Sequence, residues 1–374
     1  MRFRHPDGTL VHLAYCTNVH QAEDLDGVLT QLARFGEPVR ERLGVDRLGL
    51  GLWLARPVAT ELAGNPAAVA RLRSELATRG LEVVTLNGFP YQGFHDPVVK
   101  HKVYRPDWST PERTRYTLDL ARLLGELLPE DAVRGSVSTL PLGWRTEWRD
   151  DAGQLELLAE GLAKQDRPVR VGFEPEPGCV IETTAQAAAL LSEVDKEWLG
   201  VCLDTCHLAV GFEDPAAALD RLEAAGLDVV KLQASAALEA ANPADPATRK
   251  ALESFVEPRF LHQSNEGGPP GADDLDAALA GGLPGEAPWR VHFHVPLHAD
   301  PAPPLTSTRP VLAGTLAELF GGATARTDHI EVETYTWQVL PDAPADDAGL
   351  VAGITAELDW TRRSLIELGL EEVH

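Results

Sequence analysis

The chain of 374 residues carries 57 acidic and 33 basic side chains, so its formal net charge is −24 at pH 7. Nucleic acids and anionic membrane surfaces bind basic faces, and this composition therefore argues against both as partners. Residues 1–10 contain no apolar signal core, and no stretch reaches the roughly 18 apolar residues of a membrane span.

Cysteine usage points to the reducing interior of a cell. The 4 cysteines form no C-x-x-C pair, so the sequence suggests neither a structural zinc site nor a redox motif. Reduced thiols are typical of a cytoplasmic protein, and we expect that location without membrane insertion. The expected partner is a small-molecule metabolite, and the sequence leaves open whether the chain forms a homo-oligomer.

Short apolar runs rich in Val and Leu alternate with longer amphipathic segments along the chain. Strands of a parallel sheet covered on both faces have this composition. Helix starts lie between the runs, where Thr110-Pro111, Thr183-Thr184 and Asp214-Pro215 combine capping residues with proline. Repeated βα units favour a closed (β/α)8 TIM barrel over an open sheet. The predicted barrel strands are residues 11–18, 48–55, 83–89, 136–140, 169–174, 200–204, 229–234 and 329–337.

One long segment departs from the repeat before the last barrel strand. Residues 236–288 are rich in Ala, Pro, Gly and Asp, with a helix predicted around 246–255 and a flexible stretch at 266–274. Long segments of this kind in compact domains are usually functional or disordered. We interpret this one as an insertion, a lid on the active face of a single domain spanning 1–374. A ninth strand candidate, 290–297, belongs to the insertion or is its return strand.

Acidic residues lie where three predicted strands end, which is the catalytic end of a β/α barrel. Glu174 ends the fifth strand, Asp204 ends the sixth and Glu333 lies on the last. Converging carboxylates repel each other unless a cation is present, so the set predicts a divalent metal with carboxylate and imidazole ligands. Each acid alone is also consistent with pairing to an arginine, and Asp204 with capping the helix that carries His207.

The same region carries four short motifs. They are Glu174-Pro175, Pro177-Gly178, Thr183-Thr184 and Leu203-Asp204-Thr205-Cys206-His207. This pattern resembles the hydroxypyruvate isomerase and tagatose epimerase branch of the xylose-isomerase-like TIM barrels, and Glu333 resembles the glutamate of that family's last strand. The resemblance implies that Glu174, Asp204 and Glu333 are metal ligands and that the two glutamates exchange the substrate proton. It makes His207 a substrate-binding or supporting residue.

The chain departs from that family on the seventh strand. The family has a His ligand there in a His-x-Gln pattern, and this sequence has Lys231-Leu232-Gln233. His292 and His294 share one face of a predicted strand, and we prefer His294 as the replacement ligand. Alternatively, Lys231 itself supplies positive charge and the site is weak or free of metal.

Further residues complete the predicted site. His207, Lys231, Gln233, His292 and Asn87 are the predicted substrate-binding residues. Other candidates have two interpretations. Glu176 and Glu331 share faces with the preferred ligands, Asn18 suits ligand binding or helix capping, and Cys206 suits thiolate ligation or, more commonly, packing.

Over its whole length the chain resembles the family of the metabolite traffic protein EboE. The segments that carry this resemblance are residues 14–20, 86–91, 104–108, 138–143, 291–296 and 331–337. It implies a role in moving a metabolite precursor toward export. The combined hypothesis is an EboE-like protein with a sugar isomerase or epimerase-type site, holding zinc or manganese and acting on a small polyhydroxylated or keto metabolite. The alternative is an inactive metabolite carrier on the same barrel, and the net charge makes endonuclease chemistry remote.

Overall fold

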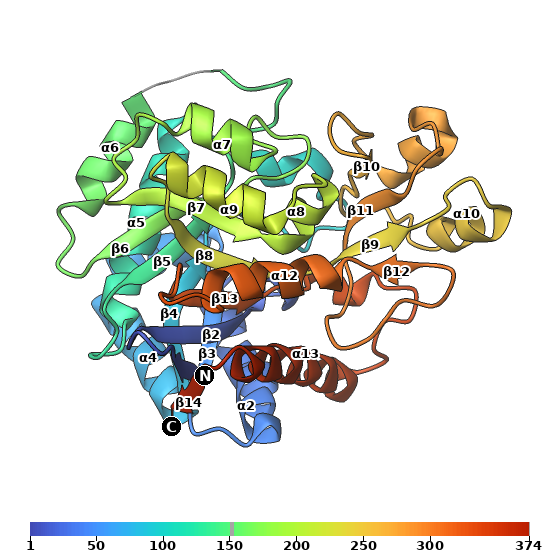
Figure 1. The fold of residues 1–374 in the computed structure, drawn as a ribbon. Helices are drawn as coiled ribbons and strands as arrows, with labels where there is room; N and C mark the ends of the chain where they lie inside the picture. Colours follow the sequence, from blue (N-terminus) through green and yellow to red (C-terminus); the bar gives the residue numbers. More distant parts are fainter. Residues whose placement is uncertain (150–152, 374) are drawn as a thin grey trace.

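A closed barrel of parallel strands forms the body of the molecule (Figure 1). The computed structural model describes residues 1–149 and 153–373. Parallel pairing runs through β2-β3-β4-β5-β6-β7-β8-β13, and β13 pairs with β2 to close the ring. The predicted (β/α)8 fold is therefore confirmed. The barrel strands are β2 (Leu10–Cys16), β3 (Leu48–Trp53), β4 (Leu81–Asn87), β5 (Gly135–Thr139), β6 (Val169–Phe173), β7 (Leu199–Asp204), β8 (Val229–Ala234) and β13 (His329–Val332).

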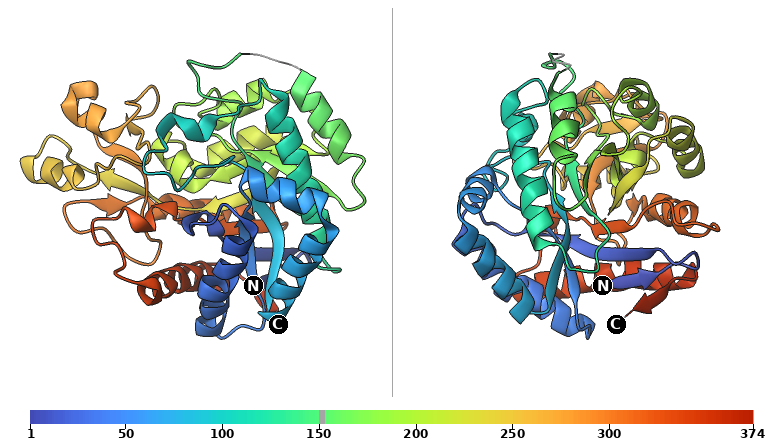
Figure 2. Two further views of the ribbon diagram at one scale, coloured as in Figure 1. Left: turned by 180° about the vertical axis from the view of Figure 1, so that it is seen from behind. Right: turned by 90° about the vertical axis from the view of Figure 1, so that its left-hand side faces the viewer.

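Helices surround the barrel, as the views in Figures 1 and 2 show. They are α1 (Leu25–Gln31), α2 (Glu37–Leu43), α3 (Arg56–Gly64), α4 (Pro66–Thr78), α5 (Pro111–Leu127), α6 (Gly153–Leu162), α7 (Thr184–Leu190), α8 (Thr205–Val210), α9 (Pro215–Ala224), α12 (Arg309–Phe320) and α13 (Asp347–Glu367). Short strands β1 (Arg2–Arg4) and β14 (Glu371–Val373) pair beside β2, so the two ends of the described chain lie close together. Among the described residues, no helix is both long and apolar enough to cross a membrane.

Helix starts follow the local chemistry expected from the sequence. Thr183 and Gln186 form a capping box at α7, and the Asp214 side chain accepts the backbone N–H of Ala217 at α9. Helix α5 begins at Pro111 as predicted, but the Thr110 side chain makes no capping hydrogen bond. Its hydroxyl donates to the carbonyl of Asp107 instead.

A second, antiparallel sheet lies beside the barrel between β8 and α12, on the right in Figure 1. Its strand order is β10-β11-β9-β12. The elements of this segment are β9 (Ala237–Ala240), α10 (Pro246–Glu253), β10 (Ser264–Glu266), α11 (Leu275–Ala277), β11 (Trp289–His294) and β12 (Thr306–Ser307). The ninth strand candidate is thus β11, which carries His292 and His294 and pairs with β9 and β10 rather than with the barrel.

The last barrel strand is shorter than predicted. The expected strand 329–337 ends at Val332, and Tyr335–Gln338 forms a 3₁₀ helix. Side chains of this segment hydrogen-bond to neighbouring elements: Thr334 and Trp337 donate to Glu357 of α13. The backbone N–H of Glu333 still donates to the carbonyl of Ala234 in β8, but the chain then turns into the 3₁₀ helix, so the strand prediction was wrong for 333–337.

Candidate metal centre

Three acidic side chains meet at the carboxyl end of the barrel. Glu174 directly follows β6, Asp204 ends β7 and Glu333 directly follows β13. One carboxylate oxygen of each lies within 4.8 Å of the others. Their exposed fractions are 3%, 1% and 5%, so water does not solvate this negative charge.

The electrostatic cost of this arrangement appears in the pKa values. Burial raises the pKa of Glu174 well above its ordinary value, and the charges of Glu333 and Asp204 raise it further. Burial likewise raises the pKa of Glu333 to about 8, with Asp204 and Glu331 adding to the effect. Within the described residues, Glu174 Oε2 and Asp204 Oδ2 have no hydrogen-bond partner. A divalent cation would supply both the missing charge and the missing partner.

Two asparagines fix the carboxylate of Glu333. Asn18 Nδ2 and Asn87 Nδ2 donate to its Oε1 at 2.7 and 2.9 Å. Asn87 was predicted to bind substrate, and the structure brings it to the site as a support for Glu333. Asn18, which had two interpretations, has the same role from the end of the first barrel strand.

His294 completes a set suited to a metal ion. Its Nδ1 lies 2.7 Å from the carbonyl oxygen of Glu333, so Nδ1 carries the proton and Nε2 presents a lone pair. Nε2 has no partner among the described residues, and one ring nitrogen of His294 lies within 4.8 Å of a carboxylate oxygen of Asp204. Three carboxylates and one imidazole suit zinc or manganese. Glu174, Asp204, His294 and Glu333 therefore fit such an ion, and the unpartnered atoms carry this judgement.

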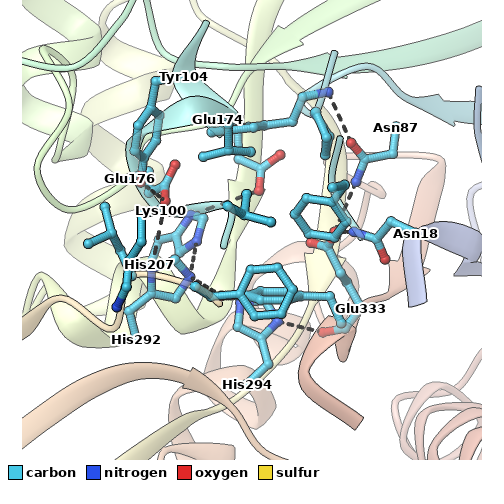
Figure 3. A pocket seen from close by; sticks show the side chains of 18 residues that line it. Asn18, Asn87, Lys100, Tyr104, Glu174, Glu176, His207, His292, His294 and Glu333 are labelled. Carbon is cyan, nitrogen blue, oxygen red and sulfur yellow. Dashed lines mark hydrogen bonds and ion pairs between the residues drawn. The ribbon is translucent and has the colours of Figure 1, made fainter. Parts of the chain in front are cut away.

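Asp204 also serves as a helix cap. Its Oδ1 accepts the backbone N–H of His207 at 2.9 Å and the hydroxyl of Ser235 at 2.8 Å. Capping and ligation are compatible here because they use different oxygens. His207 itself lies beside Glu176 and His292 on the cavity wall (Figure 3).

The structure does not bring Lys231 and Gln233 to the cavity wall. Lys231 is fully buried and forms an ion pair with Glu331, and its Nζ lies 3.4 Å from Ser138 Oγ. Gln233 is adjacent to Asp204 in register but does not line the cavity. Lys231 pairs directly with Glu331, and its charge lowers the pKa values of Glu174 and Glu333 by less than burial and the neighbouring acids raise them.

The cavity above the acids is narrow, about 60 Å³, and its lining combines polar and apolar side chains (Figure 3). The polar part of the lining consists of the amides, acids and histidines described above, together with Lys100 and Tyr104. The rest of the lining is mainly aromatic and aliphatic. Its members include Phe89, Phe94, Val99, Phe260, Leu261 and Tyr335. Phe260 and Leu261 belong to the segment that also forms the second sheet, so that segment contributes to the cavity.

The fold and site define a TIM-barrel protein with a carboxylate–histidine cluster at its strand ends. Residues 41–257, more than half of the 374, match the family described as xylose isomerase-like TIM barrel. The chain belongs to that family.

Individual relatives are distant. A probable endonuclease 4 from Carboxydothermus hydrogenoformans is 27% identical over 151 residues, which cover 36% of this chain and 53% of the relative. The chain thus spans about half the length of that curated relative.

Solved structures share the fold. A D-allulose 3-epimerase from Methylomonas sp. aligns with a TM-score of 0.53 at 10% identity, over 97% of this chain and 100% of that one. A D-psicose 3-epimerase with D-tagatose from Clostridium cellulolyticum H10 gives 0.50 at 15% identity, over 95% and 99%. A xylose isomerase-like TIM barrel protein from Mycobacterium smegmatis in complex with magnesium gives 0.50 at 13%, over 95% and 98%. At these identities the likeness establishes the fold alone.

Proposed function

We propose that the chain is a divalent-metal-dependent isomerase or epimerase that acts on a small polyhydroxylated or keto metabolite. The observation that carries the proposal is the buried set of acids with unpartnered oxygens, together with the free Nε2 of His294. Epimerases of sugars occur among proteins of this fold, which supports the reaction class. Zinc or manganese is the proposed ion, held by Glu174, Asp204, His294 and Glu333.

The bound ion would polarise the hydroxy-carbonyl group of the substrate. Glu174 and Glu333 would then exchange a proton with the carbon next to the carbonyl. Burial and the neighbouring carboxylates raise both pKa values in the metal-free site, and a bound cation would lower them, so that each carboxylate could accept the substrate proton. Asn18 and Asn87 would hold Glu333 in place during the transfer.

The alternative of an inactive carrier depends on Lys231 replacing the charge of a metal. The Lys231–Glu331 ion pair argues against that replacement. We retain a role in metabolite traffic of the EboE type as part of the proposal, supported by sequence resemblance only. Deleting the gene should then change how a metabolite divides between cells and medium, and unchanged metabolite profiles would contradict this part.

Metal analysis tests the centre itself. Purified wild-type protein should contain zinc or manganese, and Glu174→Gln and Asp204→Asn should each lose at least one equivalent. Glu61→Gln replaces an exposed acid on α3 and should retain the wild-type content. A wild type that lacks metal and gains no thermal stability from added divalent ions would overturn the proposal.

Proton exchange tests the chemistry. With small ketoses and hydroxy-ketones in deuterated water, wild-type protein should introduce deuterium next to the carbonyl, as measured by NMR. Glu333→Gln should reduce this exchange by about 100-fold or more, the usual contribution of a general acid–base group. A metal-loaded wild type that exchanges none of these substrates would favour the carrier hypothesis.

A further inference from the structure

Three aromatic rings from separate segments of the chain meet in the lining of the cavity. Phe94 lies in the segment after β4, Phe260 lies between α10 and β10, and Tyr335 begins the 3₁₀ helix after β13. The ring centroids of Phe94 and Phe260 are 5.2 Å apart. The Tyr335 centroid lies 5.7 Å from that of Phe94 and 4.9 Å from that of Phe260. We call these three rings the aromatic cluster.

The aromatic cluster lies directly beside the candidate metal centre. The ring centroids of Tyr335 and His294 are 4.6 Å apart. The cavity is narrow, about 60 Å³, and the cluster and the acids line the same space. A ligand that reaches the acids therefore also contacts aromatic carbon.

Backbone and ion-pair contacts hold Phe260 in place. The backbone N–H groups of Val99 and Lys100 both donate to the carbonyl of Arg259, at 2.8 and 2.9 Å. The ammonium group of Lys100 also forms an ion pair with Asp274. These contacts join the segment after β4 to the segment that carries Phe260. The apolar surface is thus preformed and does not depend on a loosely held side chain.

Most side-chain donors of the lining already have partners within the protein. Nδ2 of Asn18, Nδ2 of Asn87 and the hydroxyl of Tyr104 each donate to a glutamate. Lys100 is the one Lys or Arg in the described lining, and Asp274 neutralises it. Hydroxyl groups of a ligand beyond its hydroxy-carbonyl unit would find few donors here, and a buried polar group without a partner costs affinity. An anionic group would find no free Lys or Arg in this lining.

We propose that the preferred substrate is a neutral α-hydroxy-ketone with an apolar end group, which packs against Phe94, Phe260 and Tyr335. This inference rests on the proposed function and narrows its substrate class from hydroxyl-rich sugars to ketones with few hydroxyl groups. Burial of the apolar group against the aromatic cluster favours binding in proportion to the area removed from water. A hydroxyl at the same place loses its bonds to water and is disfavoured.

Two four-carbon ketones test this preference because they differ only at their ends. Acetoin has methyl groups where erythrulose has hydroxymethyl groups. Ligand-observed NMR on the metal-loaded wild type measures the Kd of each ketone without requiring turnover. Acetoin should bind at least about 10-fold more tightly, the effect of leaving a buried hydroxyl unpaired. Its kcat/KM for deuterium exchange at the hydroxyl-bearing carbon, relative to the uncatalysed exchange, should also be larger.

A variant with a matched control assigns the preference to the aromatic cluster. Phe260→Asn replaces a ring with an amide that can bond to hydroxyl groups, and it should reduce the ratio of the two Kd values to less than about 3-fold. Val256→Asn alters an apolar residue of the same segment that is 41% exposed, and it should keep the wild-type ratio. The wild-type ratio itself needs no variant and remains decisive if Phe260→Asn does not fold.

The outcomes separate this inference from the proposed function. Erythrulose or its 4-phosphate binding as tightly as acetoin would overturn the inference, and deuterium exchange with erythrulose would then leave the proposed function intact. Preferential binding of acetoin without exchange of either ketone would support the apolar preference and contradict the proposed function. A preference that persists in Phe260→Asn would overturn the role of the cluster, and binding of neither ketone would overturn the inference altogether.

Discussion

Glu331 of β13 and Glu333, which directly follows that strand, have contrasting environments although they lie only two residues apart. Glu331 points into the barrel, where Lys231 neutralises it, and both side chains are fully buried. Glu333 lies one layer higher, at the cavity, where it meets Glu174 and Asp204 and, among the described residues, accepts side-chain hydrogen bonds from two asparagine amides.

We call the Lys231–Glu331 pair inside the barrel the lower layer, and the acids at the cavity the upper layer. The sequence leaves space for the lower layer. A Cβ at Gly51 of β3 would lie 1.3 Å from Glu331 Oε1, so only glycine leaves room for the carboxylate. The barrel thus balances charge where the interior is closed and leaves it unbalanced where the cavity opens. Unbalanced buried charge that a cation would relieve distinguishes a candidate site from a structural ion pair.

Breaking the Lys231–Glu331 ion pair should cause the largest loss of stability. Lys231→Met removes the cation and leaves Glu331 buried without its partner, which costs about 3–5 kcal/mol. Chemical denaturation of metal-free protein measures this loss in the free energy of unfolding. The double variant Lys231→Met/Glu331→Leu should recover most of it, because no buried charge remains. Equal losses in the single and double variants would contradict the comparison.

Removing the charge of Glu333 in the upper layer should raise the stability of the metal-free protein, whereas Lys231→Met lowers it. Burial, with the charges of Asp204 and Glu331, raises the pKa of Glu333 to about 8. A raised carboxyl pKa contributes stability at low pH, and that stability is lost as the pH rises from about 4.5 through about 8. Glu333→Gln stays neutral and can still accept from Asn18 and Asn87. In the absence of metal it should be more stable than wild type at pH 9, by an amount on the order of 2–3 kcal/mol.

Urea unfolding at pH 5, 7 and 9 in the presence of a chelator measures this difference. Glu61→Gln, at an exposed position of α3, provides the control and should follow the wild-type profile. Parallel profiles for wild type and Glu333→Gln would show that Glu333 is not destabilised by its neighbours.

The sequence predicts the barrel and the meeting of the acids for the same reason. Strands buried on both faces have a recognisable composition, and their carboxyl ends must lie together once the sheet closes. Glu174, Asp204 and Glu333 could therefore be selected before any coordinates were known. That they bind metal stays a prediction.

Other features depend on pairings that no local pattern reveals. Lys231 and Glu331 meet because β8 lies beside β13, with Glu331 opposite Gln233, and only closure of the barrel sets that register. His292 and His294 reach the cavity through an antiparallel sheet formed by short strands far apart in sequence. The segment that follows β13 bonds to Glu357 of α13, 23 residues beyond Thr334.

Glu357 extends the comparison to a buried acid satisfied by neutral donors alone. It accepts the backbone N–H of Leu297, the Thr334 hydroxyl and the Trp337 indole N–H, at 3.1, 2.6 and 3.0 Å. Burial raises its pKa to about 7, and these bonds limit the rise. Its contribution to stability should therefore decline as the pH rises from about 4.5 through about 7.

Glu357→Gln should cost about 1–2 kcal/mol below pH 5, because its amide N–H₂ faces a donor. The variant should also lack the decline that wild type shows between pH 4.5 and 7. Thermal unfolding across that range measures both effects, with Glu367→Gln, an exposed acid at the end of α13, as the control. A variant that keeps the wild-type pH profile would assign the decline to another group.

Ser138→Ala should have the smallest effect and defines what holds Lys231 in place. Ser138 Oγ lies 3.4 Å from Lys231 Nζ, and the carbonyl of Leu86 lies at 3.5 Å, so both contacts are weak beside the ion pair with Glu331. If the ion pair dominates, removing this hydroxyl should cost less than about 1 kcal/mol. Denaturation alongside Lys231→Met allows the comparison under identical conditions. A loss close to that of Lys231→Met would mean that polar contacts around the ammonium group, and not Glu331 alone, stabilise the buried charge of Lys231.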